Sequence, residues 1–259
     1  MYKIAIPSYK RADVISLKTL RFLEGIDPSR IYIFVASEEE KNDYQKKISR
    51  EKYGEIIVGK LGIVQQRNFI RYYFDEGDYV ISIDDDIEEL SFLGKDGFEK
   101  VIDIDYFFND MYLTLQKLNL FIWGIYPTRN DFYIKCNKHD MSLSLTFLIG
   151  CMHGYIVRHD KSLDLNVESS GKEDIEQSIL YYLKDNGIVR MNRYAVRTKF
   201  YSEGGLGKIT DRFEINRSAG LFLERKYGCS LYERKNGMTE CRISLKKLKD
   251  RKWIAGSKN

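Results

Sequence analysis

The sequence predicts an α/β fold in which a central, mostly parallel sheet carries helices on both faces. Across the first 83 residues, short apolar runs typical of buried strands alternate with longer segments whose apolar residues recur at helical spacing. The fourth apolar run ends in three consecutive aspartates, Asp84, Asp85 and Asp86. Ligands of open α/β sheets bind beyond the carboxyl ends of the strands, so this position also predicts a ligand site.

In the first half of the chain, the apolar runs predict four strands, at 4–6, 31–35, 55–58 and 78–83. The segments between them predict three helices, at 13–23, 38–48 and 62–74. Strands joined by a helix are expected to pair in parallel, because the helix returns the chain to the edge where the first strand began.

The second half shows a more mixed pattern. We expect helices at 103–118, 174–185, 210–227 and 244–253, and strands at 121–125 and 194–201. Two further strands, at 131–136 and 143–157, are expected to form a small antiparallel insertion packed on the sheet. These assignments predict one α/β domain over 1–205 and a basic, helical C-terminal extension over 206–259 that packs on the same domain.

The composition limits the class of protein. Of the 259 residues, 43% are hydrophobic, which is enough for a sizeable core. No stretch approaches about 18 uncharged apolar residues, and the N-terminus lacks a signal-peptide pattern. The four cysteines never approach Cys-x-x-Cys spacing, which argues against a zinc site or a disulfide scaffold. We therefore expect a cytoplasmic protein without membrane contact, and no pattern in the sequence assigns an oligomeric state.

The charges are unevenly distributed. The net charge is +4, yet residues 190–259 contain 18 Lys and Arg against 7 Asp and Glu. A basic segment on an acidic body suggests a polyanionic partner, with nucleic acid as the first candidate. A solvated basic tail without a partner is equally compatible with the charge pattern alone.

The three aspartates after the fourth strand suggest a cation site. Clustered carboxylates repel one another unless a cation compensates their charge. Hard oxygen ligands suit Mg²⁺ or Mn²⁺, which bind through one or two carboxylates together with phosphate oxygens. A spacing of two places Asp84 and Asp86 on the same side of an extended chain. The alternative is a group of solvated loop acids at the end of a strand.

Two other strand–helix junctions at this edge carry residues suited to a nucleotide. After the first strand, Pro7, Tyr9 and Arg11 place an aromatic ring and a cation where a base and phosphates would lie. After the third strand, Gly62 begins a helix that carries Arg67, and a helix N-terminus with an arginine can bind an anion. In the alternative interpretation, Gly62 belongs to a turn and Arg67 lies on a helix surface.

Taken in order, the motifs Ile-Pro-Ser-Tyr-Lys-Arg, Gly-Ile-Val-Gln-Gln-Arg-Asn, Asp-Asp-Asp and Gly-Lys-Glu173-Asp174 resemble those of GT-A-fold glycosyltransferases over residues 1–205. The Pro-Ser-Tyr-Lys-Arg opening and the Lys-Thr-Leu-x-Phe-Leu helix at 18–23 are similar to the TET/JBP-associated glycosyltransferase family. Those phage and eukaryotic enzymes are linked to sugar addition on 5-hydroxymethylpyrimidines in DNA.

The resemblance implies roles for residues around a nucleotide-sugar. Asp86 would bind a divalent metal ion, Mn²⁺ or Mg²⁺, that bridges the diphosphate, and Asp84 would bind the ribose or the metal. Asp85 would touch the donor sugar. The base pocket would be lined by Pro7, Tyr9 and Arg11, with the helix start at Gly62 and with Arg67 near the uracil or the phosphates.

The resemblance also assigns the catalytic carboxylates. The pair Glu173-Asp174 resembles an acidic motif whose Asp is the catalytic base of inverting members. Acidic residues in a first helical turn are also ordinary capping residues, which is the alternative for this pair.

The third metal ligand of the wider pattern, often a late histidine, has no equivalent, because no histidine follows His159. Ser202, Glu203, a backbone carbonyl or water could replace it. His153 could approach the donor or the acceptor, although a lone histidine in an apolar run is more often a core residue.

The implied function is metal-dependent transfer of a sugar, with glucose expected, from a UDP-sugar to 5-hydroxymethylpyrimidine bases in DNA. Cations expected to follow the DNA backbone are Arg190, Arg193, Arg197, Lys199, Lys208, Arg212 and Arg217. Two alternatives remain open: a glycosyltransferase for a glycan or protein acceptor, and a noncatalytic DNA-binding module on a degenerate transferase fold.

Overall fold

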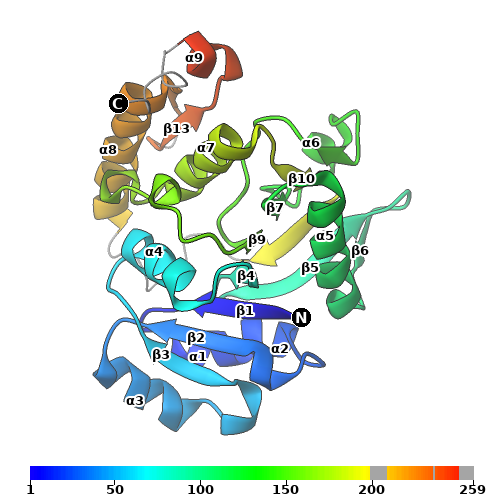
Figure 1. Ribbon diagram of the computed structural model, residues 1–259, viewed down its shortest axis with the longest axis vertical. Helices are drawn as coiled ribbons and strands as arrows, with labels where there is room; N and C mark the ends of the chain where they lie inside the picture. The colour runs from blue at the N-terminus through cyan, green and yellow to red at the C-terminus, as the bar shows by residue number, and fades with distance from the viewer. Residues whose placement is uncertain (199–208, 236, 251–259) are drawn as a thin grey trace.

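A central sheet with the strand order β3-β2-β1-β4-β9-β7-β10-β8 runs through the protein (Figure 1). This computed structural model describes residues 1–198, 209–235 and 237–250. The four strands expected in the first half are confirmed as β1 (Tyr2–Pro7), β2 (Ile31–Val35), β3 (Glu55–Val58) and β4 (Tyr79–Ile83). They pair in parallel, with Ile4 opposite both Ile31 and Ile81.

The other half of the sheet is mixed. Strand β9 (Met152–Ile156) is antiparallel to both β4 and β7 (Ile122–Ile125). Strand β10 (Val189–Met191) is parallel to β7, and β8 (Met141–Ser142) is antiparallel to β10. The carboxyl ends of β1, β4 and β7 and the beginning of β9 therefore lie at one edge of the sheet.

Helices cover both faces of the sheet, as predicted. They are α1 (Ala12–Leu17), α2 (Thr19–Phe22), α3 (Glu38–Lys47), α4 (Ile63–Tyr73), α5 (Ile104–Leu118), α6 (Asp131–Lys135), α7 (Glu173–Asp185), α8 (Ile209–Tyr227) and α9 (Leu245–Asp250). Short 3₁₀ helices lie at η1 (Pro28–Arg30), η2 (Arg50–Lys52), η3 (Lys161–Leu163) and η4 (Val167–Ser169). None of the helices within the described residues is long and apolar enough to cross a membrane.

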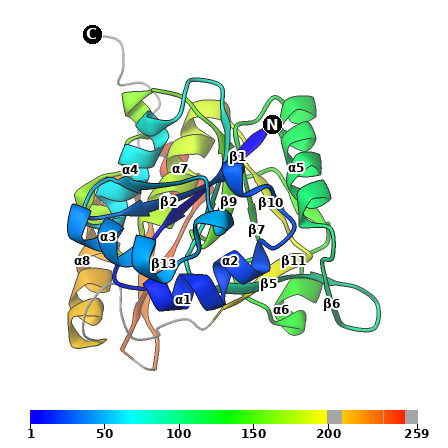
Figure 2. The same cartoon turned by 90° about the horizontal axis from the view of Figure 1, so that it is seen from below.

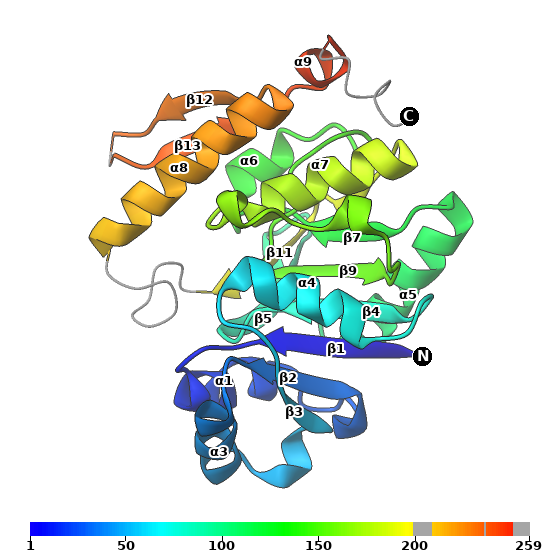
Figure 3. The same cartoon turned by 60° about the vertical axis from the view of Figure 1, so that its left-hand side comes forward.

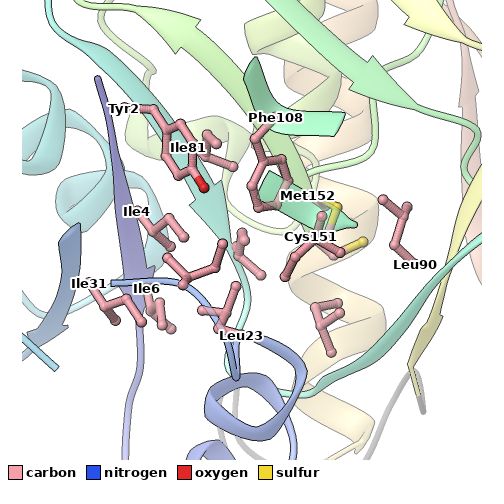
Figure 4. Close-up of a cluster of buried hydrophobic side chains, with 14 of the residues drawn as sticks. Tyr2, Ile4, Ile6, Leu23, Ile31, Ile81, Leu90, Phe108, Cys151 and Met152 are labelled. Atoms are coloured by element: carbon pink, nitrogen blue, oxygen red, sulfur yellow. The ribbon is translucent and has the colours of Figure 1, made fainter. Parts of the chain in front are cut away.

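The alternation of side chains along the strands explains the two layers of helices. Ile4 and Ile6 of β1 point into one core with Phe108 of α5, and Figure 4 shows part of this cluster. Ala5 points into the second core, which Ile70 of α4 shares. Figure 2 shows α4 and α8 on one side of the sheet and α5 on the other.

The helix expected at 13–23 is broken at Lys18, whose φ and ψ are −116° and −85°. The break allows the Thr19 hydroxyl to donate a hydrogen bond to the Asp84 carbonyl oxygen at 2.8 Å and to accept one from the Ile87 amide at 2.9 Å. Thr19 therefore holds both ends of the turn that contains the three aspartates.

The prediction of strands at 131–136 and 143–157 is largely wrong. Residues 131–135 form helix α6, because the Asn130 side chain accepts a hydrogen bond from the Phe132 amide at 3.1 Å and caps its first turn. Within 143–157, the strand β9 belongs to the central sheet rather than to an insertion. A small antiparallel sheet does exist, but it consists of β11 (Tyr194–Thr198), β5 (Ile87–Leu93) and β6 (Phe98–Lys100).

The C-terminal third contains a hairpin that the sequence analysis missed, formed by β12 (Ser230–Glu233) and β13 (Thr239–Arg242). Helix α8 is tied to α7 through the buried Glu176 carboxylate, which accepts a hydrogen bond from the Tyr227 hydroxyl at 2.7 Å. The Lys226 ammonium lies 3.1 Å from the same carboxylate. The division at residue 205 stays a prediction, and the glycine-rich segment with Ser202 and Glu203 lies outside the described residues.

Candidate active site

A cavity of about 450 Å³ opens at the edge of the sheet where β1 and β4 end. The strand order reverses between these two neighbours, and ligands of open α/β sheets bind at such a switch point. Its lining includes these residues singled out from the sequence: Pro7, Tyr9, Arg11, Gly62, Arg67, Asp84, Asp85, Asp86 and Glu173. The structure therefore brings together both strand–helix junctions, the aspartates and Glu173, one of the two predicted catalytic acids.

Asp85 is bound from two sides and is only 5% exposed. The Ser8 hydroxyl donates to one of its oxygens at 2.6 Å, and the Arg11 guanidinium donates to the other at 3.0 Å. Burial raises the pKa of Asp85, while the hydrogen bond from Ser8 and the charge of Arg11 oppose this shift. Asp85 thus anchors the loop after β1, and its contact with a donor sugar stays a prediction.

Asp86 is oriented by a residue that the sequence analysis missed. The Thr198 hydroxyl, at the end of β11, donates to one Asp86 oxygen at 2.8 Å. Arg11 lies 3.4 Å from the other oxygen. No local sequence signal marks Thr198, because the pairing of β11 with β5 across more than a hundred residues places it here.

Arg67 is buried and bridges two groups of acids. Its guanidinium lies 3.6 Å from the Asp84 carboxylate and 3.4 Å from the Glu173 carboxylate. It also donates a hydrogen bond to the Gly150 carbonyl oxygen at 3.1 Å. A Cβ atom on Gly150 would lie 2.6 Å from this guanidinium, so only glycine allows the approach. Contact of Arg67 with uracil or phosphate stays a prediction, and the structure adds this bridging role.

The Asp84 carboxylate faces the cavity, where 35% of its side chain remains exposed. Burial at the bottom of the cavity raises the pKa of Asp84 to about 7, Arg67 opposes the shift, and Asp86 and Asp85 add to it. The carboxylates of Asp85, Asp86 and Glu173 thus add negative charge around Asp84, and the charge of Arg67 opposes it.

The two acids at the start of α7 have different surroundings. The Glu173 carboxylate lines the cavity and accepts a hydrogen bond from the Gly171 amide at 3.1 Å. The Asp174 carboxylate accepts hydrogen bonds from the amides of Gly150 at 3.2 Å and Ile175 at 2.9 Å. Burial, followed by the charge of Glu173, raises the pKa of Asp174 to about 7.

The end of the cavity near β1, β2 and β3 has a different lining. Gly62, at the N-cap of α4, has a φ of +94°, a conformation that favours glycine. Gln66, which the sequence analysis did not single out, is buried one turn later and accepts a hydrogen bond from the Lys60 amide at 2.6 Å. The Lys10 ammonium lies over the Tyr9 ring, 5.2 Å from the centre of the ring.

His153 is a buried core histidine. One ring nitrogen lies 3.2 Å from the Gly150 carbonyl oxygen, and the other lies 3.2 Å from the Gln177 amide nitrogen. Burial and the nearby charge of Arg67 lower the pKa of His153 to about 3, so the ring is neutral. His153 is therefore a core residue whose two ring nitrogens both have polar contacts, which is the alternative given in the sequence analysis.

Asp84 and Asp86 fit a divalent cation by the chemistry of their oxygens. Within the described part of the chain, no three His, Cys, Asp or Glu side chains converge on a ready-made metal site. Mg²⁺ and Mn²⁺ need only one or two carboxylates when a diphosphate supplies further oxygens. The carboxylates around Asp84 provide the negative charge that such a cation compensates.

No protein-family model and no curated protein matches the sequence. Among solved structures, the chain is similar to glucosyl-3-phosphoglycerate synthase from Mycobacterium tuberculosis in complex with Mn²⁺, UDP and glucosyl-3-phosphoglycerate. The TM-score is 0.51 at 9% identity, over 95% of this chain and 88% of that one. S. aureus TarS 1–349 gives a TM-score of 0.46 at 12% identity, over 88% and 72% of the two chains. The similarity to the synthase and the strand order confirm the predicted GT-A fold.

Proposed function

We propose that the protein is a metal-dependent glycosyltransferase that takes a sugar from a UDP-sugar. The observation that carries the proposal is the convergence of Asp84, Asp86 and Glu173 on one cavity at the switch point of a GT-A-type sheet. The similar glucosyl-3-phosphoglycerate synthase was solved with Mn²⁺ and UDP, which supports the same donor and metal here.

The donor end follows from the lining of the cavity. Asp86 and Asp84 would hold the divalent ion, and its bound form supplies a Lewis acid for the diphosphate leaving group. Thr198 and Arg11 fix the Asp86 carboxylate, while Thr19 holds the backbone of the turn. The base and ribose would lie toward Pro7, Tyr9 and Gln66.

The transfer step needs a base near the acceptor hydroxyl. As the acceptor oxygen bonds to the anomeric carbon, the bond from that carbon to the diphosphate breaks and UDP leaves with the electron pair. The hydroxyl proton passes to a carboxylate, for which Asp174 is the predicted group and Glu173 the neighbour that faces the cavity. A single displacement of this kind inverts the anomeric configuration, so a product of retained configuration would contradict it.

For the acceptor, we propose 5-hydroxymethylpyrimidine bases in DNA, supported by the sequence resemblance and by the basic C-terminal third. The enzyme would have to extrude such a base from a duplex to reach its hydroxyl. Some of the expected cations already have partners: Arg193 pairs with Asp140, and Arg197 pairs with Glu88 and Glu89. Arg217 is exposed, whereas Lys199, Lys208 and the Arg212 side chain lie outside the described residues.

The ion pairs of Arg193 and Arg197 favour a second candidate, a glycosyltransferase whose acceptor is a glycan or a protein. In that case the basic segment would contribute no DNA affinity. The noncatalytic DNA-binding alternative is disfavoured, because clustered acids that line a cavity repel a polyanion.

The experiment is UDP release from UDP-glucose with Mn²⁺, comparing hydroxymethylated with unmodified DNA and wild type with Asp86→Asn. Release that requires both the modified base and Asp86 supports the reaction, the acceptor and the metal site together. Release that is indifferent to DNA keeps the transferase and rejects the DNA acceptor. If UDP and Mn²⁺ fail to bind in calorimetry, the transferase proposal itself is wrong.

A further inference from the structure

The C-terminal third contributes to the cavity with apolar and amide side chains. Ile215 and Asn216 of α8, and Met238 in the turn before β13, line its wall. Figure 3 shows α8 next to the hairpin, with α7 beneath them. The sequence analysis had assigned this segment a cationic role only, and the cavity lining now gives it a second one.

The strand order tells which end of the cavity this wall closes. Lining residues follow the sheet from the ends of β3, β2 and β1, past the aspartates after β4, to the start of α7 beside β9. A nucleotide-sugar has the linear order base, ribose, diphosphate and sugar. With the diphosphate at Asp84 and Asp86, and the base toward β1 and β2, the sugar and the acceptor must lie toward Glu173 and the wall.

Hydrogen bonds and apolar packing join the wall to the start of α7. With its amide oxygen toward α7, Asn216 accepts a hydrogen bond from the buried Lys172 ammonium at 3.2 Å. Its amide nitrogen donates to the Thr239 carbonyl oxygen of β13 at 2.6 Å. Ile215 packs on the turn before Glu173 so closely that a Cβ atom on Gly171 would lie 3.2 Å from its methyl group.

We propose that Ile215 and Met238 form the acceptor-side wall of the site and select an alcohol that carries an apolar or aromatic face next to its reacting hydroxyl. The inference rests on the proposed function. Apolar side chains leave the hydroxyl groups of a polyol without hydrogen-bond partners, whereas they bury a ring or a hydrocarbon face favourably. Glu173 lines the same cavity two residues after Gly171, the position on which Ile215 packs.

The test compares benzyl alcohol with glycerol as probe acceptors, using UDP-glucose and Mn²⁺. In the wild type, we expect benzyl alcohol to have the higher kcat/KM. Met238→Ser and Ile215→Ser should each lower kcat/KM for benzyl alcohol about tenfold, since an apolar contact of this size discriminates by roughly 10- to 200-fold. Leu221→Ser, at a half-exposed position on the outer side of α8, is the matched control and should change it less than twofold.

One further readout separates this inference from the proposed function. The affinity for UDP with Mn²⁺, measured by calorimetry, should stay within twofold of wild type in both serine variants, because the base and the diphosphate lie away from the wall. If the wild type binds no UDP, the proposed function fails and the wall has no acceptor to select. If UDP binds but glycerol equals benzyl alcohol, if neither is glycosylated, or if the variants lose UDP affinity instead, the acceptor-side wall is wrong.

Discussion

Replacing Arg67 by methionine removes the guanidinium that bridges Asp84 and Glu173 and keeps an unbranched side chain at this position. Removing one partner of a buried ion pair costs about 3 to 5 kcal/mol. The lost hydrogen bond to the Gly150 carbonyl adds to this cost, whereas the 35% exposure of Asp84 reduces it. We expect the free energy of unfolding to fall by about 4 kcal/mol at pH 8.

The pH dependence makes this prediction specific. Folding raises the pKa of Asp84 and Asp174 to about 7, so the native protein binds more protons than the unfolded chain between about pH 4 and pH 7. Stability from these groups is therefore greatest in acid and is lost as pH rises through 7. The charge of Arg67 lowers the pKa of both Asp84 and Asp174. Without Arg67, the repulsion among these carboxylates is therefore largest at a pH at which they are charged. At pH 5 the loss should shrink to about 2 kcal/mol, because Asp84 is then neutral and the remaining loss comes from the Gly150 carbonyl and the contact with Glu173.

The assay is urea denaturation of wild type and Arg67→Met at pH 5 and pH 8. Arg225→Met, in an exposed ion pair with Glu168, is the matched control and should cost less than about 1 kcal/mol at either pH. A loss for Arg67→Met below about 1 kcal/mol at pH 8, or one that is equal at the two pH values, would refute the bridging role.

Three further predictions concern the site. Asp174→Asn should lower kcat at least a hundredfold, because it removes the predicted base. Glu173→Gln should act mainly on KM, because we expect Glu173 to bind the acceptor rather than to deprotonate it. Steady-state kinetics separate the two effects. Because a general base must be charged, kcat/KM for UDP-glucose should rise about tenfold per pH unit up to an apparent pKa of about 7. In Asp174→Asn, the rise that comes from the titration of Asp174 should be absent. Thr19→Val removes the hydroxyl that bonds the Asp84 carbonyl and the Ile87 amide, so it should lower the free energy of unfolding by about 1 to 3 kcal/mol. It should also weaken the binding of Mn²⁺ with UDP, which calorimetry measures. Unchanged affinity would contradict the role of Thr19 in holding the turn.

The elements that the sequence predicts well are those governed by local pattern. The apolar runs of β1 to β4 are buried on both faces, which is why short continuous runs identify them. Their order, in turn, predicts the edge at which the aspartates and the start of α4 meet. The gathering of these residues around one cavity could therefore be predicted from about ninety contiguous residues.

Other features depend on contacts that no local pattern encodes. Phe132, Tyr133 and Ile134 have the composition of a strand, yet the cap from Asn130 makes a helix there and leaves Phe132 and Tyr133 exposed. Thr198 reaches Asp86 only through the pairing of distant strands. Likewise, the different surroundings of Glu173 and Asp174 depend on the backbone of Gly150, which adjacent sequence positions cannot reveal.

The two ends of the cavity come from different stretches of the chain. The base end is built from the first 74 residues, where each strand is followed directly by the helix that packs on it, whereas the wall at the opposite end comes from residues 215 to 238. Insertions or substitutions in the late segment can therefore reshape one end and leave the other intact. Under the proposed function, a lineage with this architecture could exchange one reaction partner and keep the other, because separate parts of the gene would encode the two recognition surfaces.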